Sequence, residues 1–144
     1  MLGFVADLPL SGGLDRSNFA NMTAKLIVFV RAPQLGQVKT RLAKAIGEKA
    51  ALAAYKTLLD RLFDNLKTLR NVELRYTPDS ALTAFARWLR PGWCLAPQGG
   101  GDLGTRLARA FQRSFAAGSH GVVIIGSDCP AITSADIESA GRAL

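Results

Sequence analysis

The chain has 144 residues, of which 49% are hydrophobic and 20% are charged, and its formal net charge is +7 at pH 7. These values predict one soluble globular domain that is long enough to bury a core. They exclude a transmembrane protein, because no apolar run approaches the roughly 18 residues that span a bilayer. The apolar N-terminus lacks a basic region and contains Asp7 and Pro9, which argues against a signal peptide. Two cysteines are too few for a disulfide framework, so we expect a cytoplasmic protein.

The positive charge indicates an acidic partner, such as a nucleotide or a nucleic acid. One basic group extends from Arg31 to Lys44 with no acid within it, and a second comprises Arg106, Arg109 and Arg113. The members of the second group are three and four residues apart, which places them on one side of a helix. This side could bind an anion or could equally be a solvated basic face. The chain contains no RNA-binding signature, zinc-finger spacing or basic leucine zipper, which argues against nucleic acid as the partner.

Residues 1–24 form an N-terminal extension without a strong pattern, and we expect it to pack against a sheet edge or a partner subunit. Residues 25–144 form the expected domain. It opens with a buried strand at 26–30, followed by the sequence RAPQLGQVKTRL from Arg31 to Leu42. This loop leads into a short helix at 39–46. A helix N-terminus beside several cations predicts an anion site, although the glycine that precedes the lysine of a P-loop is missing.

The remaining elements alternate between strands and helices. The patterns predict strands over 72–76, 93–96 and 122–125, of which the first has one more exposed face. They predict a helix over 52–69, a helix from Thr77 with Leu82, Phe85 and Leu89 buried, and a helix from about 103 with Leu103, Leu107, Ala110 and Phe111 inward. A last helix begins near Thr133, which has capping-box spacing to Asp136.

This alternation predicts an α/β fold with a mainly parallel sheet. The two most apolar strands, 26–30 and 122–125, are expected to be central. The RAPQLGQVKTRL loop and the loop Gly126–Pro130 leave the carboxyl ends of these two strands. Since ligands of parallel sheets bind at the carboxyl ends of the strands, we expect the two loops to meet at the functional site.

Asp128 is the candidate metal ligand, because its carboxylate would face the cationic loop and could hold Mg2+ or Mn2+ that bridges phosphates. The alternative is that Asp128 only caps its turn. The glycine-rich stretch from Gln98 to Gly104 would allow the backbone to approach a ligand closely, and the alternative there is a flexible turn.

Three ordered blocks resemble a known family: residues 29–42, the stretch from Gln98 to Gly104 with Arg106, and Gly126-Ser127-Asp128-Cys129-Pro130. The family is glycosyltransferase-like, was formerly of unknown function, and is distantly similar to the molybdopterin and 2-phospholactate nucleotidyltransferases. The resemblance implies a three-layer α/β/α, Rossmann-like fold of the GT-A (nucleotide-diphospho-sugar transferase) type.

The resemblance also implies roles for individual residues. Lys39, Arg41 and Asp128 would be catalytic, with Asp128 as the metal ligand, and the nucleotide would be bound by Arg31, Gly36, Gln98, Gly101, Asp102 and Arg106. The implied ligand is a nucleotide or a nucleotide-sugar.

Family members continue for some tens of residues beyond the helix that ends here at Leu144, so this chain is expected to be the nucleotide-binding half of the fold. A sheet shortened in this way would expose an edge or an apolar face, and we expect a second copy of the chain to cover it in a homodimer. The leading hypothesis is a glycosyl- or nucleotidyltransferase. The alternatives are a catalytically inactive binding or interaction module and, third, a basic nucleic-acid binder.

Overall fold

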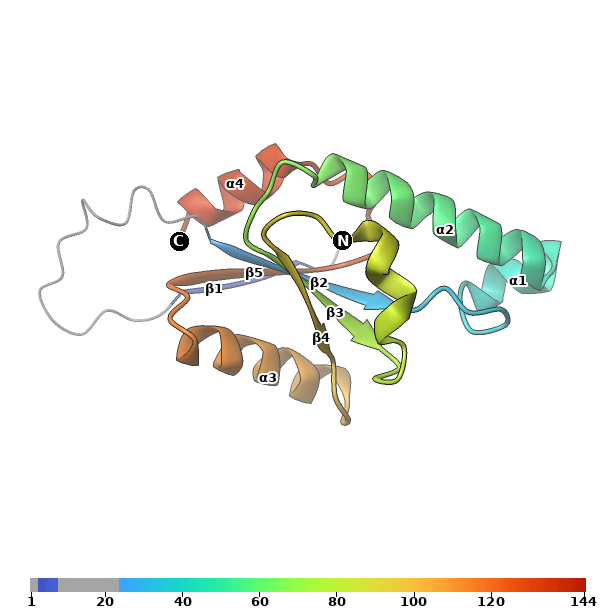
Figure 1. Cartoon of the computed structure of the whole chain (residues 1–144), viewed down its shortest axis with the longest axis horizontal. Coiled ribbons are helices and arrows are strands. Elements are labelled where there is room, and N and C mark those ends of the chain that lie inside the picture. The colour runs from blue at the N-terminus through green and yellow to red at the C-terminus, as the bar shows by residue number, and fades with distance from the viewer. Residues whose placement is uncertain (1–2, 8–23) are drawn as a thin grey trace, which may run out of the picture.

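The computed structural model describes residues 3–7 and 24–144. This part of the chain contains a five-stranded sheet with the order β1-β5-β2-β3-β4. The strands are β1 (Gly3–Asp7), β2 (Lys25–Arg31), β3 (Val72–Thr77), β4 (Trp93–Pro97) and β5 (Gly121–Gly126). The last four run parallel to their neighbours, and β1 runs antiparallel to β5 (Figure 1).

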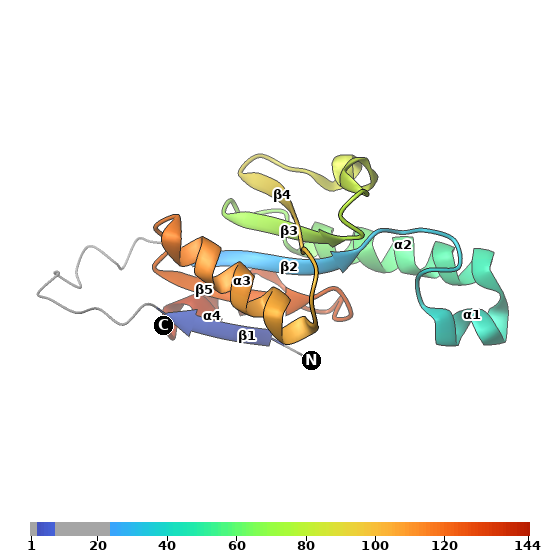
Figure 2. The same cartoon turned by 90° about the horizontal axis from the view of Figure 1, so that it is seen from below.

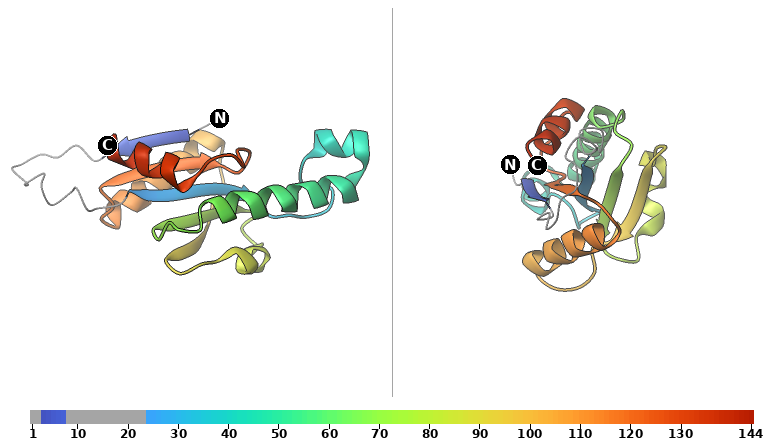
Figure 3. Two further views of the ribbon diagram at one scale, coloured as in Figure 1. Left: turned by 90° about the horizontal axis from the view of Figure 1, so that it is seen from above. Right: turned by 90° about the vertical axis from the view of Figure 1, so that its left-hand side faces the viewer.

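Helices cover both faces of the sheet. They are α1 (Thr40–Ile46), α2 (Glu48–Asn65), the 3-10 helix η2 (Leu82–Trp88), α3 (Leu103–Ala116) and α4 (Ser134–Arg142). Helices α2 and α4 lie on one face and α3 lies on the other, while α1 lies beyond the sheet at the far end of α2 (Figures 1, 2 and 3). The predicted three-layer α/β/α architecture is therefore confirmed, with the apolar strand β2 at its centre.

The two faces of the sheet have cores of different size. The larger core lies under α2, η2 and α4, where Phe63 makes edge contacts with the rings of Trp88 and Trp93 at 5.5 and 5.9 Å. The smaller core lies under α3 and comprises Ile27, Ala110, Val122 and Ile124, with partly buried aromatic side chains around it. Successive residues of a strand point to opposite faces, so β2 and β5 contribute to both cores.

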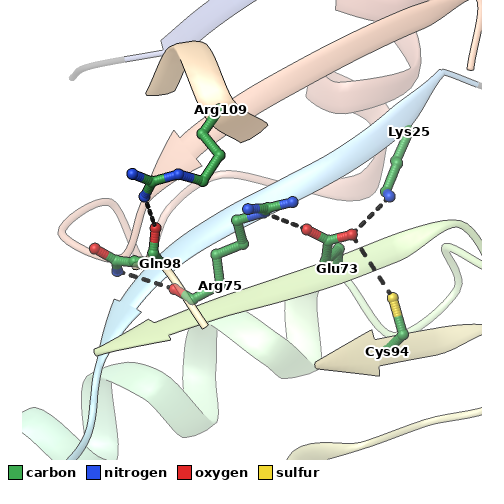
Figure 4. A network of polar contacts seen from close by, with 6 residues as sticks. All are labelled: Lys25, Glu73, Arg75, Cys94, Gln98 and Arg109. Carbon is green, nitrogen blue, oxygen red and sulfur yellow. Dashed lines mark hydrogen bonds and ion pairs between the residues drawn. The ribbon is translucent and has the colours of Figure 1, made fainter. Parts of the chain in front are cut away.

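The prediction that β3 has an exposed face is wrong. Glu73 and Arg75 are only 6% and 2% exposed. Glu73 accepts a hydrogen bond from Lys25 Nζ at 2.6 Å and also forms an ion pair with Arg75, as Figure 4 shows. Charged side chains can be buried when opposite charges neutralise each other, and the local sequence pattern does not reveal a partner 48 residues away.

The helix predicted from Thr77 begins later, at Leu82, and its predicted buried side is correct only for Phe85. The segment forms a 3-10 helix in which Phe85 and Trp88 are buried, whereas Leu82 is 52% and Leu89 is 40% exposed. Phe85 and Trp88 lie three residues apart, which is one turn of a 3-10 helix, so they share its buried side. Leu103, predicted to face inward, is 54% exposed in the first turn of α3.

The N-terminal extension contributes an edge strand. Gly3 pairs with Ile125, and Asp7 pairs with Gly121. This confirms the expected packing on a sheet edge for residues 3–7, while residues 8–23 lie outside the described part of the chain. Among the helices that the structure describes, none is long and apolar enough to cross a membrane.

Candidate functional site

The loops that follow β2 and β5 meet, as predicted from the order of the two apolar strands. Lys39 Nζ donates a hydrogen bond to Asp128 Oδ1 at 3.0 Å across 89 positions of sequence. Lys39 precedes α1, and Asp128 lies two residues beyond the end of β5. The Asp128 side chain is 85% exposed and that of Lys39 is 31% exposed. The ion pair therefore lies at the surface, at the carboxyl edge of the parallel strands.

Lys39 has an unusual backbone conformation. Its φ of 49° and ψ of 46° place it in the left-handed region, and no other non-glycine residue in the described part of the chain has a positive φ. A side chain in this region costs about 1–2 kcal/mol. Such local strain is concentrated at functional sites, where the surrounding fold holds a residue in place. The strain thus marks Lys39 as a residue whose position is imposed by its surroundings.

Tyr55 of α2 is a component of this site that the sequence interpretation missed. Its hydroxyl donates a hydrogen bond to the carbonyl oxygen of Arg31 at 2.6 Å, and its side chain is buried. Burial raises the pKa of Tyr55, and the nearby Asp128 carboxylate adds to the increase, although hydrogen bonds to Ser127 and Arg31 act in the opposite direction. A tyrosine within a stripe of leucines was the available signal, because a buried hydroxyl requires a partner.

The cationic side chains of the β2 loop are available to a ligand. Arg31 and Arg41 are exposed, and neither takes part in an ion pair among the described residues. Together with Lys39 they provide three cations, against the carboxylates of Asp128 and of Glu48, which lies beside Gly36. The local charge therefore favours an anion.

Gly36 lies beside α2 rather than beside Asp128. It has a φ of 75°, and a Cβ at this position would lie 3.2 Å from Glu48 Oε1. A cavity of about 250 Å3 adjoins it, lined by Gly36, Thr40, Ala43, Lys44 and Glu48. Glycine here allows the loop to turn against α2. Its predicted contact with a nucleotide stays a prediction.

The side chain of Gln98, the residue directly after β4, forms hydrogen bonds to the backbone of β2 and β3. Gln98 is 5% exposed. Its Nε2 donates to the carbonyl oxygen of Val30 at 3.3 Å. It also donates to the carbonyl oxygen of Arg75 at 3.0 Å, the bond that Figure 4 shows. Its Oε1 accepts a hydrogen bond from Arg106 Nη1 at 3.2 Å. Because both ends of the amide are engaged within the protein, Gln98 shapes this edge of the sheet.

Two arginines of α3 hold the glycine-rich loop. Arg106 Nε donates to the carbonyl oxygen of Gly101 at 2.8 Å. Arg109 donates to the carbonyl oxygens of Gln98 at 2.8 Å and Gly100 at 2.9 Å. A Cβ on Gly99 would lie 2.3 Å from Arg109 Nη1, so only glycine leaves room for this guanidinium. The predicted basic face of α3 is therefore largely engaged in binding its own loop.

Asp102 caps α3. Its carboxylate accepts a hydrogen bond from the backbone N–H of Thr105 at 2.8 Å, in the standard geometry of a helix N-cap. This hydrogen bond is the main reason that the pKa of Asp102 lies below its usual value. Gly101, directly before it, has a φ of 103°. The structure thus shows a capping role for Asp102, and its predicted place in a nucleotide pocket stays a prediction.

The described residues contain no group of three His, Cys, Asp or Glu side chains that could hold a metal ion. Asp128 is a single carboxylate with one oxygen bonded to Lys39. Such a donor set fits Mg2+ only when substrate phosphates and water supply most of the ligands, which is a usual arrangement for this ion. The chain's own residues are expected to bind a free metal ion weakly.

The fold and the site define an α/β protein with a cationic site at the carboxyl edge of a parallel sheet, the position at which such proteins bind ligands. Residues 61–144 match the family described as "Uncharacterized protein conserved in bacteria (DUF2064)", and the chain belongs to this family. Comparison with curated proteins found no match.

The chain is also similar to a solved structure from Desulfovibrio desulfuricans G20, described as a "putative nucleotide-diphospho-sugar transferase". The two share 31% sequence identity with a TM-score of 0.76 over 84% of this chain. The chain spans about half of that protein, 54% of its length. The family match and this neighbour confirm the resemblance and the fold type inferred from the sequence.

Proposed function

We propose that this chain binds the diphosphate of a nucleotide or nucleotide-sugar at the Lys39–Asp128 site, as the nucleotide-binding part of a glycosyl- or nucleotidyltransferase. The observation that carries the proposal is the meeting of Lys39 and Asp128 at the carboxyl ends of β2 and β5. The similarity to a protein described as a nucleotide-diphospho-sugar transferase supports the choice of ligand.

The charges of the site suit a diphosphate. In glycosyl transfer, the acceptor attacks the sugar carbon and the nucleoside diphosphate leaves with the bonding electrons. In nucleotidyl transfer, the acceptor attacks the α-phosphorus and pyrophosphate leaves. Negative charge increases on the leaving group in both reactions, and the cations of Arg31, Lys39 and Arg41 are available to stabilise it.

A divalent cation, Mg2+ or Mn2+, would be held by Asp128 together with phosphate oxygens. When bound, it would neutralise the charge of the diphosphate. Tyr55 would fix the shape of the site, because its hydroxyl holds the end of β2 beside the β5 loop. In this arrangement α2 supplies the rigid support and the two loops supply the charges.

A thermal-shift screen tests the proposal. The chain is heated with nucleoside diphosphates, nucleoside triphosphates, UDP-sugars and GDP-sugars, each with and without Mg2+. A ligand at 100 times its Kd adds about 2.7 kcal/mol of stability. For a domain of this size, that corresponds to a Tm increase of roughly 8 °C. We expect such an increase with Mg2+ present and its loss in Lys39→Ala and Asp128→Ala.

Lys67→Ala is the matched control. Lys67 forms an exposed ion pair with Asp64 at 3.2 Å, distant in sequence from both loops of the site. Its removal changes the net charge as Lys39→Ala does, so we expect the ligand-induced shift to remain. Absence of stabilisation by every nucleotide would contradict the proposal and favour a binding or interaction module. Salt-sensitive binding of oligonucleotides alone would favour the nucleic-acid alternative.

We also propose that the chain forms a homodimer. Helix α1 has no buried residue, and Leu42 and Ile46, one turn apart on it, are 39% and 50% exposed. Apolar side chains presented in this way are typical of a surface that packs against another chain. Light scattering at micromolar concentration measures the mass directly. A monodisperse monomer would contradict the dimer.

A further inference from the structure

The Lys39–Asp128 ion pair joins two groups that the proposed ligand needs separately. The phosphate oxygens of a diphosphate require the ammonium, and a divalent cation requires the carboxylate. In the structure the two groups neutralise each other at 3.0 Å. A ligand must therefore replace an existing contact on whichever group it binds.

The pair is well suited to open. The Asp128 side chain is 85% exposed, and exposed ion pairs change an equilibrium constant by about fivefold at most. Arg31 and Arg41 have no ion pair among the described residues, so the site keeps its positive charge when Lys39 exchanges partners. The backbone of Lys39 is fixed in the left-handed region, so the exchange requires only side-chain rotation.

We propose that this ion pair couples the binding of diphosphate to the binding of a divalent cation. Diphosphate alone meets a carboxylate that competes for Lys39 and repels the phosphate oxygens. The cation alone meets an ammonium that competes for Asp128. When both bind, each takes one half of the pair, so each strengthens the binding of the other by the same factor. The inference rests on the proposed function and adds to it a specificity for cation-complexed diphosphate over the free anion.

The variant that tests the coupling is Asp128→Asn. It keeps the shape of the side chain and removes its charge, so it frees Lys39 and ends the repulsion. We expect it to bind metal-free pyrophosphate up to about fivefold more tightly than the wild-type chain, and to lose most of the gain from Mg2+. Asp64→Asn is the matched control, because the exposed Asp64 carries the same charge and forms a different ion pair, with Lys67.

Calorimetric titration of the full chain with inorganic pyrophosphate, in EDTA and in Mg2+, measures these affinities. The same titrations are made with Lys39→Met and with Lys39→Met/Asp128→Asn. If the pair exchanges partners, the gain from Asp128→Asn in EDTA is larger when Lys39 is present. If neither Lys39→Met protein binds measurably, the coupling is judged on Asp128→Asn alone. A gain in EDTA together with a lost gain from Mg2+, neither of them seen in Asp64→Asn, supports the coupling, and the absence of either overturns it.

Three results would overturn the coupling. The first is an equal gain from Asp128→Asn with and without Lys39, which leaves only repulsion by the carboxylate. The second is the same gain in Asp64→Asn, which indicates an effect of net charge. The third is an absence of pyrophosphate binding in every protein and condition. The proposed function fails on a different result, namely the absence of stabilisation by any nucleotide in the thermal-shift screen.

Discussion

Replacement of Lys39 by glycine and by alanine separates the strain at this position from the charge it carries. Both substitutions remove the ammonium and its ion pair with Asp128. Alanine keeps the left-handed conformation at a cost of about 1–2 kcal/mol, whereas glycine adopts it freely. Glycine loses about 0.5–1 kcal/mol more in backbone entropy on folding. Lys39→Gly is therefore expected to be more stable than Lys39→Ala by about 0.5–1 kcal/mol.

For a domain of this size the difference corresponds to a Tm higher by about 2–3 °C in the glycine variant, which calorimetry resolves. Lys44, in the last turn of α1, provides the matched control pair. There the helical backbone favours alanine over glycine by about 1 kcal/mol, so the order of the two variants reverses. Both Lys39 variants should bind pyrophosphate more weakly than the wild-type chain. An alanine variant that is as stable as the glycine variant would show that Lys39 carries no strain.

Three further predictions concern the supports of the site. Gly99→Ala would place a Cβ against the Arg109 guanidinium and force a positive φ on alanine. We expect the free energy of unfolding, measured in urea, to fall by about 1–3 kcal/mol. Gly100→Ala is the control, because open space surrounds Gly100 and its stability should change little. Because the pKa of Asp102 is lowered in the folded state, its capping contribution to stability is present above pH 4 and is lost as the pH falls through the folded-state pKa. Asp102→Asn should therefore flatten the dependence of stability on pH below pH 4. An unchanged dependence would contradict the capping role. Tyr55→Phe should cost about 1–2 kcal/mol by leaving the last carbonyl of β2 without its donor, and a Tm equal to wild type would contradict this assignment.

The sequence predicts the parts of this fold that depend on local pattern. Two apolar runs gave the central strands, and the spacing of Thr133 and Asp136 gave the capping box that begins α4. The meeting of Lys39 and Asp128 was also predictable, because parallel strands place their carboxyl ends on one edge. These features need no knowledge of which distant residues pack together.

The missed features all depend on distant partners. The burial of Glu73 depends on Arg75 in the same strand and on Lys25, which lies 48 positions away, so the alternating pattern of β3 wrongly indicated an exposed face. The hydrogen bonds of the Gln98 amide to the carbonyl oxygens of Val30 and Arg75 were not predicted, and its contact with a ligand stays a prediction. The left-handed conformation of Lys39 has no signal in the sequence either.

The unequal cores on the two faces of the sheet have a consequence for motion. The β2 loop and α2 pack into the larger core through Val38 and Tyr55, while the glycine-rich loop is bonded to α3 over the smaller core. Segments with fewer buried apolar contacts open at lower free energy, and amide hydrogen exchange reports this opening. The amides of α3 should exchange faster than those of α2. The backbone around the glycine-rich loop is therefore expected to open at lower free energy than the backbone that carries Lys39.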